Sequence, residues 1–254
     1  RNVGGILYAV TYGRAAAIAL DPVEKKPLRR FMPGTMTYSV GFHGCNLHCL
    51  YCQNARISFA DLLRGTLPAP SRYEESVPID AAGIVKAALR AGAPSVSYTY
   101  SEPLVSYENV LDIATQAREA GLRNILVTNG FINPAPLREL LPAIDAMNID
   151  LKAFDDSVYR HWCGGRLQPV LDTIALCHTS CHVEVTTLVV PGMNDSLKAL
   201  EPLFDWLGTL DRTIPLHLSR CFPANFYTAP PTDRELLFRL AKAAKERLEY
   251  VYVG

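Results

Sequence analysis

Six short segments rich in apolar and β-branched residues recur along the chain and alternate with segments of helical pattern. They span residues 37–42, 95–100, 124–128, 146–151, 182–190 and 215–219. Several are apolar almost without interruption, which is typical of strands that are buried on both faces of a parallel sheet.

Helical patterns lie between these segments. Apolar side chains at three- and four-residue spacing predict a helix over residues 104–117, with Gly121 just beyond its end. Asp80 is expected to cap a second helix, and Thr232 with Glu235 predicts a capping box at the start of a third.

This alternation predicts parallel βα units joined by right-handed crossovers. Six units are too few for a closed eight-unit barrel, so we predict an α/β fold, an open partial TIM barrel of about (β/α)6. A doubly wound sheet is the alternative. Residues 1–36 are predicted to form a small hairpin-like N-terminal β segment, from apolar runs at 5–10 and 15–20, packed on the core. Residues 37–254 would form the barrel, with a single domain overall.

Composition narrows the class of protein. The 254 residues are 49% hydrophobic and 20% charged, with 25 basic and 25 acidic side chains, so no nucleic-acid partner is indicated. No apolar run approaches the ~18 residues of a membrane span, and no signal-peptide pattern precedes the first strand. The chain begins at Arg1, which we expect to be a trimmed start. Seven cysteines, an odd number, favour a reducing, cytoplasmic location over a disulfide framework.

Three of the cysteines crowd into one loop directly after the first of the six strands. Cys45, Cys49 and Cys52 have the spacing C-x3-C-x2-C, and thiolates are ligands for iron–sulfur clusters or zinc. Only three ligands are local, which hints at an open coordination position. A Cys3His zinc site with His43 or His48, and three incidental buried thiols, are the alternatives.

Polar side chains follow the other predicted strands, at the end where barrel enzymes carry their active sites. They include Ser101, Glu102, Asn129, Asp150, Lys152, Asn194 and Asp195, with His217 inside the last strand. Asparagine and aspartate at such positions are also ordinary turn and cap residues. Glu102 and Lys152 are less easily explained in this way, because charged groups at strand ends near a core need partners.

Tyr51 directly before Cys52 completes the pattern C-x3-C-x-aromatic-C, and with it the chain resembles the radical S-adenosylmethionine (radical SAM) superfamily. Within the superfamily it resembles the glycyl-radical-enzyme activase branch, and it resembles the AmmeMemoRadiSam system enzymes more closely still. The stretches that carry the resemblance are residues 21–28, 41–54, 98–103, 127–130, 148–152, 190–195 and 215–217.

The resemblance implies a [4Fe-4S] cluster on Cys45, Cys49 and Cys52, whose fourth iron chelates S-adenosylmethionine. An electron from a donor such as flavodoxin or ferredoxin would release a 5′-deoxyadenosyl radical. This radical would abstract hydrogen from an unidentified small-molecule or protein substrate, which makes the chain an oxidoreductase-type enzyme.

The resemblance also assigns cofactor contacts. Ser101 and Glu102 would bind the methionine amino group, Thr128 and Asn129 the methionyl or ribose part, Asp150 and Lys152 the carboxylate and ribose, and Tyr51, Val190 and His217 the adenosine end. No catalytic residue is assigned. Val127 stands where activases carry an aspartate for a monovalent cation, and Asn148 replaces an apolar residue beside it, which puts that cation site in doubt.

The sequence is compatible with several functions. Within the superfamily, the chain either activates a glycyl radical enzyme or modifies another substrate in a Memo-linked pathway. Outside it, the alternatives are a non-catalytic zinc or electron-transfer module, and a hydrolase or lyase that uses Glu102, Lys152 and His217 as acid–base groups. Cys163, Cys177, Cys181 and Cys221 are expected to be structural thiols, and loops 53–77 and 222–231 are candidates for substrate or partner contacts.

Overall fold

A curved sheet of eight strands forms the centre of the protein. The computed structural model describes residues 2–7, 9, 11–59 and 76–254. In their order across the sheet the strands are β12 (Val251–Val253), β11 (Leu216–Arg220), β10 (His182–Val189), β9 (Ala146–Asp150), β8 (Arg123–Thr128), β7 (Ser95–Thr99), β5 (Met36–Gly41) and β4 (Ala17–Pro22). Neighbouring strands are parallel except for β4, which runs antiparallel to β5.

Each of the six predicted strands is confirmed to within one residue at either end. β12 was not predicted, because three residues are too few to show a period. The sheet does not close on itself, so the predicted open partial TIM barrel is confirmed.

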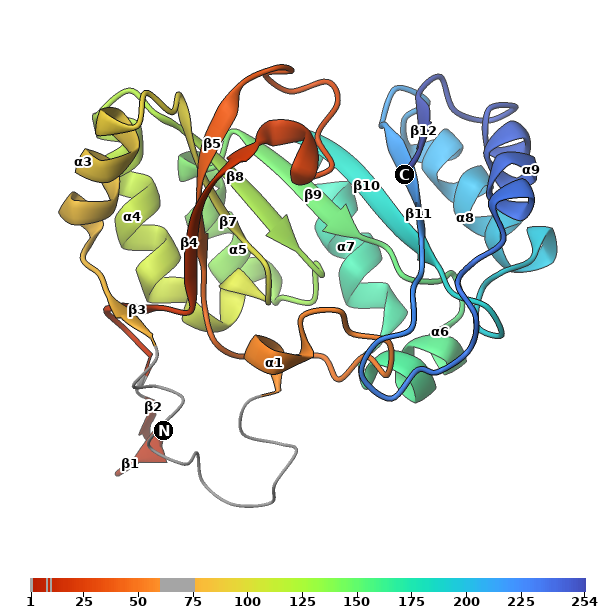
Figure 1. Ribbon diagram of the computed structural model, residues 1–254, viewed down its shortest axis with the longest axis horizontal. Coiled ribbons are helices and arrows are strands. Elements are labelled where there is room, and N and C mark those ends of the chain that lie inside the picture. The colour runs from red at the N-terminus through yellow and green to blue at the C-terminus, as the bar shows by residue number, and fades with distance from the viewer. Residues whose placement is uncertain (1, 8, 10, 60–75) are drawn as a thin grey trace.

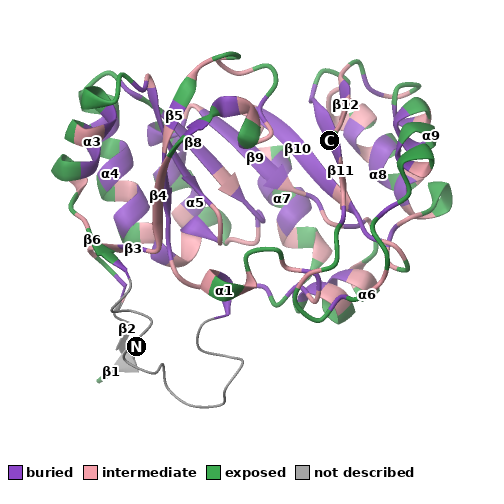
Figure 2. Cartoon of the chain, in the orientation of Figure 1, coloured by how far each residue is buried: buried purple, intermediate pink, exposed green. Residues whose placement is uncertain are grey.

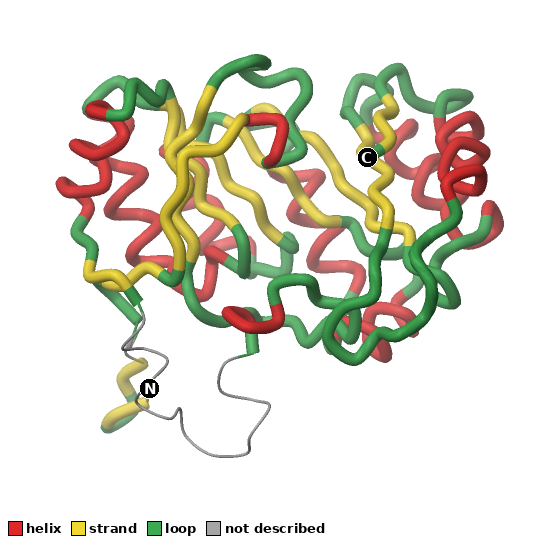
Figure 3. The backbone as a smooth tube through the Cα atoms, viewed as in Figure 1, coloured by secondary structure: helices red, strands yellow, loops and turns green. Residues whose placement is uncertain are grey.

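Helices cover the outer side of the sheet, as the separate helical and strand layers of Figures 1 and 3 show. They are α3 (Ala81–Arg90), α4 (Tyr107–Glu119), α5 (Pro134–Leu140), α7 (Leu167–Cys177), α8 (Leu197–Leu210) and α9 (Arg234–Ala244). Shorter elements are α1 (Ala55–Ser58), α6 (Asp156–Val158), η1 (Val23–Lys25), η2 (Pro103–Ser106), η3 (Leu141–Ala143), η4 (Tyr159–Cys163), β1 (Asn2–Val3), β2 (Ile6–Leu7), β3 (Arg14–Ala15) and β6 (Val77–Pro78). Among the described residues, no helix has both the length and the apolar character needed to cross a membrane.

The predicted helix starts were correct in one case and wrong in another. The Asp80 side chain accepts a hydrogen bond from the Gly83 N–H and caps α3, as predicted. The capping box at α9 is wrong, because Asp233 is the capping residue and accepts from the Glu235 N–H. The buried Thr232 hydroxyl donates instead to the backbone carbonyl of Val189.

The N-terminal hairpin is also paired differently from the prediction. The run that contains β4 pairs with β5 of the main sheet rather than with the run before it. β1 pairs with β2, and residues 8 and 10 of the first predicted run lie outside the described residues. The boundary at residue 36, and residues 37–254 as the barrel, stay a prediction.

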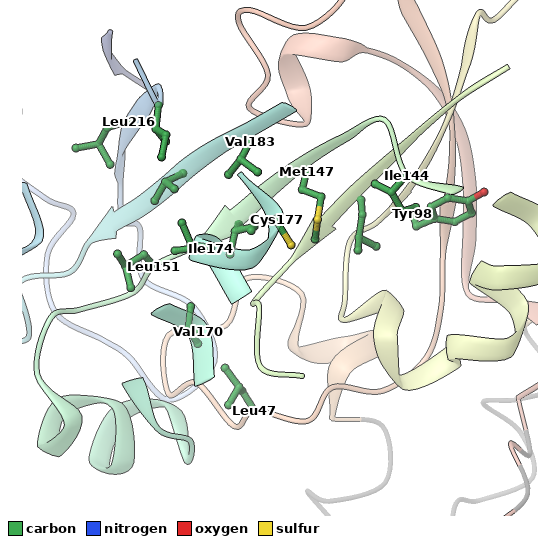
Figure 4. Packing of buried hydrophobic residues seen from close by; sticks show 14 of the residues in the cluster. Leu47, Tyr98, Ile144, Met147, Leu151, Val170, Ile174, Cys177, Val183 and Leu216 are labelled. Carbon is green, nitrogen blue, oxygen red and sulfur yellow. The ribbon is translucent and has the colours of Figure 1, made fainter. Parts of the chain in front are cut away.

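The main hydrophobic core lies between the sheet and the helices. Met147 of β9 and Leu151 just after it belong to the same buried cluster as Val170 and Ile174 of α7, and all four are fully buried (Figure 4). The central strands, such as β7 and β9, are almost continuously buried (Figure 2). Burial of this apolar surface is the dominant stabilising contribution to the fold.

A second, smaller cluster lies on the other face of the sheet. Val23 and Leu28 of the N-terminal segment pack with Ile125 and Ala146, whose side chains alternate with the core-facing side chains of β8 and β9. Pro22 pairs with Met36, the first residue of β5, so η1 begins at the amino-terminal edge of the parallel strands. The N-terminal segment therefore covers this end of the barrel interior.

One buried carboxylate fastens that segment to the sheet. Glu184 of β10 is fully buried and accepts hydrogen bonds from the backbone N–H groups of Arg29 (3.0 Å) and Arg30 (2.8 Å). It also bonds His217 (2.6 Å) and His182 (3.0 Å). Burial alone would raise the pKa of Glu184, but these hydrogen bonds outweigh it and lower the pKa to about 2.

Replacing Glu184 with glutamine is expected to lower the free energy of unfolding by about 3 kcal/mol, because an amide cannot satisfy the same buried donors. The wild-type contribution is present above pH 4.5, the ordinary value, and is lost as the pH falls through about 2. Urea unfolding at pH 7 and pH 3 measures both effects. Glu119→Gln, at an exposed position on α4, is the control, and an equal stability of the two variants would contradict the prediction.

Candidate functional site

The cysteine loop lies at the carboxyl-terminal edge of the sheet, directly after β5. Its backbone is tied to η4 by hydrogen bonds from His48 N–H to the Cys163 carbonyl (2.7 Å) and from Leu50 N–H to the Trp162 carbonyl (3.0 Å). A side chain at Gly41 would come within 2.5 Å of the Tyr100 ring, so glycine is needed where the loop leaves the strand. These contacts fix the path of the loop.

Cys45, Cys49 and Cys52 all line a single cavity of about 450 Å³. Cys49 is 7% exposed and the other two are half-buried. The Cys45 sulfur accepts hydrogen bonds from the Leu47 N–H (3.3 Å) and from the Asn129 side-chain amide (3.6 Å). Burial raises the pKa of Cys45 to about 12, so this thiol is protonated until a metal binds to it.

The donor set suits a cubane cluster. Among the described residues, no three cysteine, histidine or carboxylate side chains converge closely enough to hold one metal ion. A [4Fe-4S] cluster binds each thiolate on a separate iron, so its three ligands need not converge on a point. Neither histidine of the loop is among the described residues that line the cavity, and His48 is exposed and stacks on Phe59. The arrangement fits three thiolates better than a Cys3His zinc site.

Glu102 is a charged group of this cavity that is almost completely buried, at 1% exposed. One of its oxygens accepts from the Thr128 hydroxyl (2.8 Å) and the other from the Asn129 N–H (2.8 Å). Burial raises the pKa of Glu102 to about 7, although these hydrogen bonds act in the opposite direction. A cation bound in the cavity would stabilise the ionised form of this carboxylate.

Asp150 and Lys152 form an ion pair at the end of β9, with 2.9 Å between Lys152 Nζ and Asp150 Oδ2. Burial by itself would lower the pKa of Lys152, but the charge and hydrogen bond of Asp150, together with the nearby Cys49 and Cys163, raise the pKa. Both residues line the cavity, together with Ser101, Thr128, Asn129 and Tyr51. The cavity thus carries a buried carboxylate and an ammonium group beside the three thiols.

Two residues predicted for the adenosine end are not among the described residues that line the cavity. Val190 is fully buried after β10, where its N–H donates to the Asn194 side chain. His217 is paired with Glu184 and stacks on Tyr252, with 5.1 Å between the ring centroids. These contacts give His217 a structural role in the barrel interior. Its role in binding the adenosine end stays a prediction.

The structure adds two neighbours of the thiols that the sequence did not assign. A hydrogen bond to Cys163, together with burial, raises the pKa of Cys49. The Cys163 sulfur also lies 3.4 Å from the Tyr51 hydroxyl. In loop 222–231, the Asn225 amide donates to the Cys49 carbonyl and the Phe226 N–H to the Leu50 carbonyl. Nothing in the sequence pairs these segments, because they are more than a hundred residues apart.

The remaining residues singled out in the sequence are a loop, two further cysteines and the two positions of the doubtful cation site. Most of loop 53–77 falls on residues 60–75, outside the described residues. Cys177 ends α7 and is fully buried, and Cys181 is partly buried. Val127 lines the cavity, and the Asn148 amide donates to the Pro27 carbonyl at 2.8 Å. Asn148 therefore helps to hold the N-terminal segment.

Comparisons with known proteins agree with this geometry. The model of the radical SAM superfamily matches residues 39–204. The uncharacterised protein MJ0808 of Methanocaldococcus jannaschii is 42% identical over the whole chain, which spans 74% of that protein. Pyruvate formate-lyase 1-activating enzyme of Escherichia coli K12 is 26% identical over 61% of the chain and 61% of its own length.

A solved structure supports the fold. SuiB of Streptococcus suis bound to S-adenosylmethionine matches 85% of this chain and 46% of its own, at 15% identity and a TM-score of 0.59. Radical SAM proteins use a [4Fe-4S] cluster and S-adenosylmethionine as cofactors. Because the family model matches more than half of the chain, the chain belongs to the radical SAM superfamily.

Proposed function

We propose that this protein is a radical SAM enzyme with Cys45, Cys49 and Cys52 as the cluster ligands. One observation carries the proposal: a single cavity is lined by the three thiols, the buried Glu102 and the Asp150–Lys152 pair. When bound, the cluster supplies the electron that cleaves S-adenosylmethionine into methionine and a 5′-deoxyadenosyl radical, which abstracts a hydrogen atom from the substrate.

The residues of the cavity would bind and orient S-adenosylmethionine. Glu102 would accept a hydrogen bond from the methionine ammonium group, and Lys152 would donate one to the carboxylate. Thr128 and Asn129 hold the Glu102 carboxylate in place by hydrogen bonds of 2.8 Å. Because Glu102 and Lys152 are mostly buried, these charged contacts would form with little competition from water.

Anaerobic purification followed by metal and product analysis tests the proposal. We expect about four iron and four sulfide per chain, an S = 1/2 signal on reduction, and 5′-deoxyadenosine formed from added S-adenosylmethionine. A flavodoxin or ferredoxin is the proposed electron donor, with dithionite as the substitute in the assay. Stoichiometric zinc without sulfide would reject the proposal in favour of a non-catalytic zinc module.

Activation of a glycyl radical enzyme is a second candidate, supported by the similarity to the pyruvate formate-lyase activating enzyme. In that case the hydrogen donor is a glycine of a partner protein. Incubation of the reduced enzyme and S-adenosylmethionine with a glycyl radical enzyme from the same organism should then give a protein-bound radical signal. A 5′-deoxyadenosine yield without that radical would favour a different substrate.

A further inference from the structure

The same cavity is also lined by polar side chains that are not among the proposed S-adenosylmethionine contacts. Lys25 and Lys26 reach it from the N-terminal segment, and Thr186 and Ser219 reach it from β10 and β11. The proposed function assigns no role to these residues. These side chains are therefore available to contact a substrate bound in the same cavity.

The two lysines bring more positive charge than their partner neutralises. Lys25 Nζ lies 2.8 Å from one oxygen of Asp21, and Lys26 Nζ lies 2.7 Å from the other. Two ammonium groups thus share one carboxylate, which also accepts from the Tyr100 hydroxyl at 2.5 Å. An ammonium group has three N–H donors, so both lysines keep donors for a further acceptor.

Lys26 is a charged residue that lines the cavity and is almost completely buried. It is 1% exposed, and its Nζ lies 4.7 Å from the centroid of the Tyr100 ring. Burial lowers the pKa of Lys26, although Asp21 opposes this. A buried cation that gains an anionic neighbour is stabilised, because the interaction is strong where water is excluded.

The hydroxyl group of Thr186 independently indicates a ligand in this cavity. Its side chain is 7% exposed and lines the cavity, and its hydroxyl is buried without a hydrogen-bond partner among the described residues. Buried hydroxyl groups are nearly always hydrogen-bonded, and one that is not calls for an explanation such as a missing ligand. A valine would fill the same volume without the unpaired oxygen.

The segment that carries the lysines is held firmly. Glu184 binds the N–H groups of Arg29 and Arg30, and Asn148 binds the Pro27 carbonyl. Positioning by contacts of this kind lowers the entropy cost of binding.

We propose that Lys25, Lys26 and Thr186 form a subsite for an anionic oxygen group of the substrate, a carboxylate or a phosphate. The substrate of this enzyme would then be an acid or a phosphate ester, oriented with its anionic group toward the N-terminal segment. This inference rests on the proposed function, since it names the substrate class of the same cavity.

Binding of simple anions to the cluster-reconstituted protein with saturating S-adenosylmethionine tests the subsite. The probes are inorganic phosphate and acetate, titrated in separate anaerobic calorimetry experiments. Wild type should bind at least one of them at millimolar concentration, and the preferred probe distinguishes a phosphate ester from a carboxylate. Failure of both probes to bind would overturn the proposal.

Substitutions of Lys25 test whether the anion binds at the proposed subsite. Lys25→Ala is expected to weaken the affinity for the preferred probe about tenfold or more, because a charge-assisted hydrogen bond is lost, and Lys25→Arg should restore most of it. Lys242→Ala, at an exposed position on α9, is the matched control and should bind as wild type does. Equal affinities of Lys25→Ala and Lys242→Ala would contradict the subsite.

Thr186→Val separates binding from packing. We expect severalfold weaker anion binding together with an unchanged or higher melting temperature of the ligand-free protein, since an unpaired hydroxyl is removed. A lowered melting temperature with unchanged binding would mean that the hydroxyl is structural. Formation of 5′-deoxyadenosine by wild type, measured on the same preparation, tests the proposed function independently of anion binding.

Discussion

Replacing Cys49 with alanine is expected to abolish formation of 5′-deoxyadenosine, with a loss of at least about a thousandfold, equivalent to about 4 kcal/mol in the activation barrier. Cys49 is 7% exposed and central in the cysteine loop, so water has little access to the position that its thiolate would leave empty. The reconstituted variant should also hold much less iron and sulfide than wild type. Product analysis by chromatography and iron and sulfide assays measure the two effects.

Cys181→Ala is the matched control for this experiment. Cys181 is a partly buried free thiol that is not among the described residues lining the cavity. The variant should keep wild-type iron, sulfide and product. Wild-type 5′-deoxyadenosine formation and iron content in Cys49→Ala would contradict the prediction and remove Cys49 from the proposed cluster ligands.

Glu102→Gln is expected to weaken binding of S-adenosylmethionine by about ten- to a hundredfold, because the charged acceptor for its ammonium group is lost. Equilibrium dialysis against S-adenosylmethionine measures the affinity without the need for turnover. Glu108→Gln, at an exposed position on α4, is the control and should bind normally. Normal binding by Glu102→Gln would remove this carboxylate from the proposed site.

The same carboxylate predicts a pH dependence. Since burial raises the pKa of Glu102 to about 7, the wild-type affinity for S-adenosylmethionine should fall as the pH drops below that value, and the glutamine variant should lack this fall. In the ligand-free protein the sign for stability is the reverse. The folded state binds this proton more tightly than the unfolded state, so ionisation of Glu102 costs stability as the pH rises from 4.5 to about 7.

The strand pattern and the cysteine loop could be predicted because both are encoded locally. A buried parallel strand is a short apolar run, and the runs at 95–100 and 182–190 lie within one residue of β7 and β10. The carboxyl ends of parallel strands meet at one edge, which is why Glu102 and Lys152 could be placed near Cys45 before the structure was known.

Long-range partners could not be predicted. Glu184 is one charged residue within an apolar run, and its sequence neighbours give no sign that it binds the Arg29 N–H, 155 residues away. The Glu184 carboxylate is also the hydrogen-bond partner of His217. The resemblance assigned this residue to the adenosine end of the cofactor, an assignment that stays a prediction, and the structure shows its ring bonded to Glu184 at 2.6 Å. Which way a strand residue points depends on its register, and which partner it meets depends on the fold.

The sequence by itself determined the class of fold and the edge of the sheet that carries the thiols, since apolar periodicity and ligand spacing act over a few residues. The superfamily was indicated by the resemblance of its motifs to those of a known family. Only the tertiary structure decided that the N-terminal segment crosses the barrel interior and brings Lys25 and Lys26 into the cavity with Thr186. The physical reason is that buried polar groups must be satisfied by whatever donors the chain brings near, and Glu184 and Asn148 find theirs in the backbone at Pro27, Arg29 and Arg30.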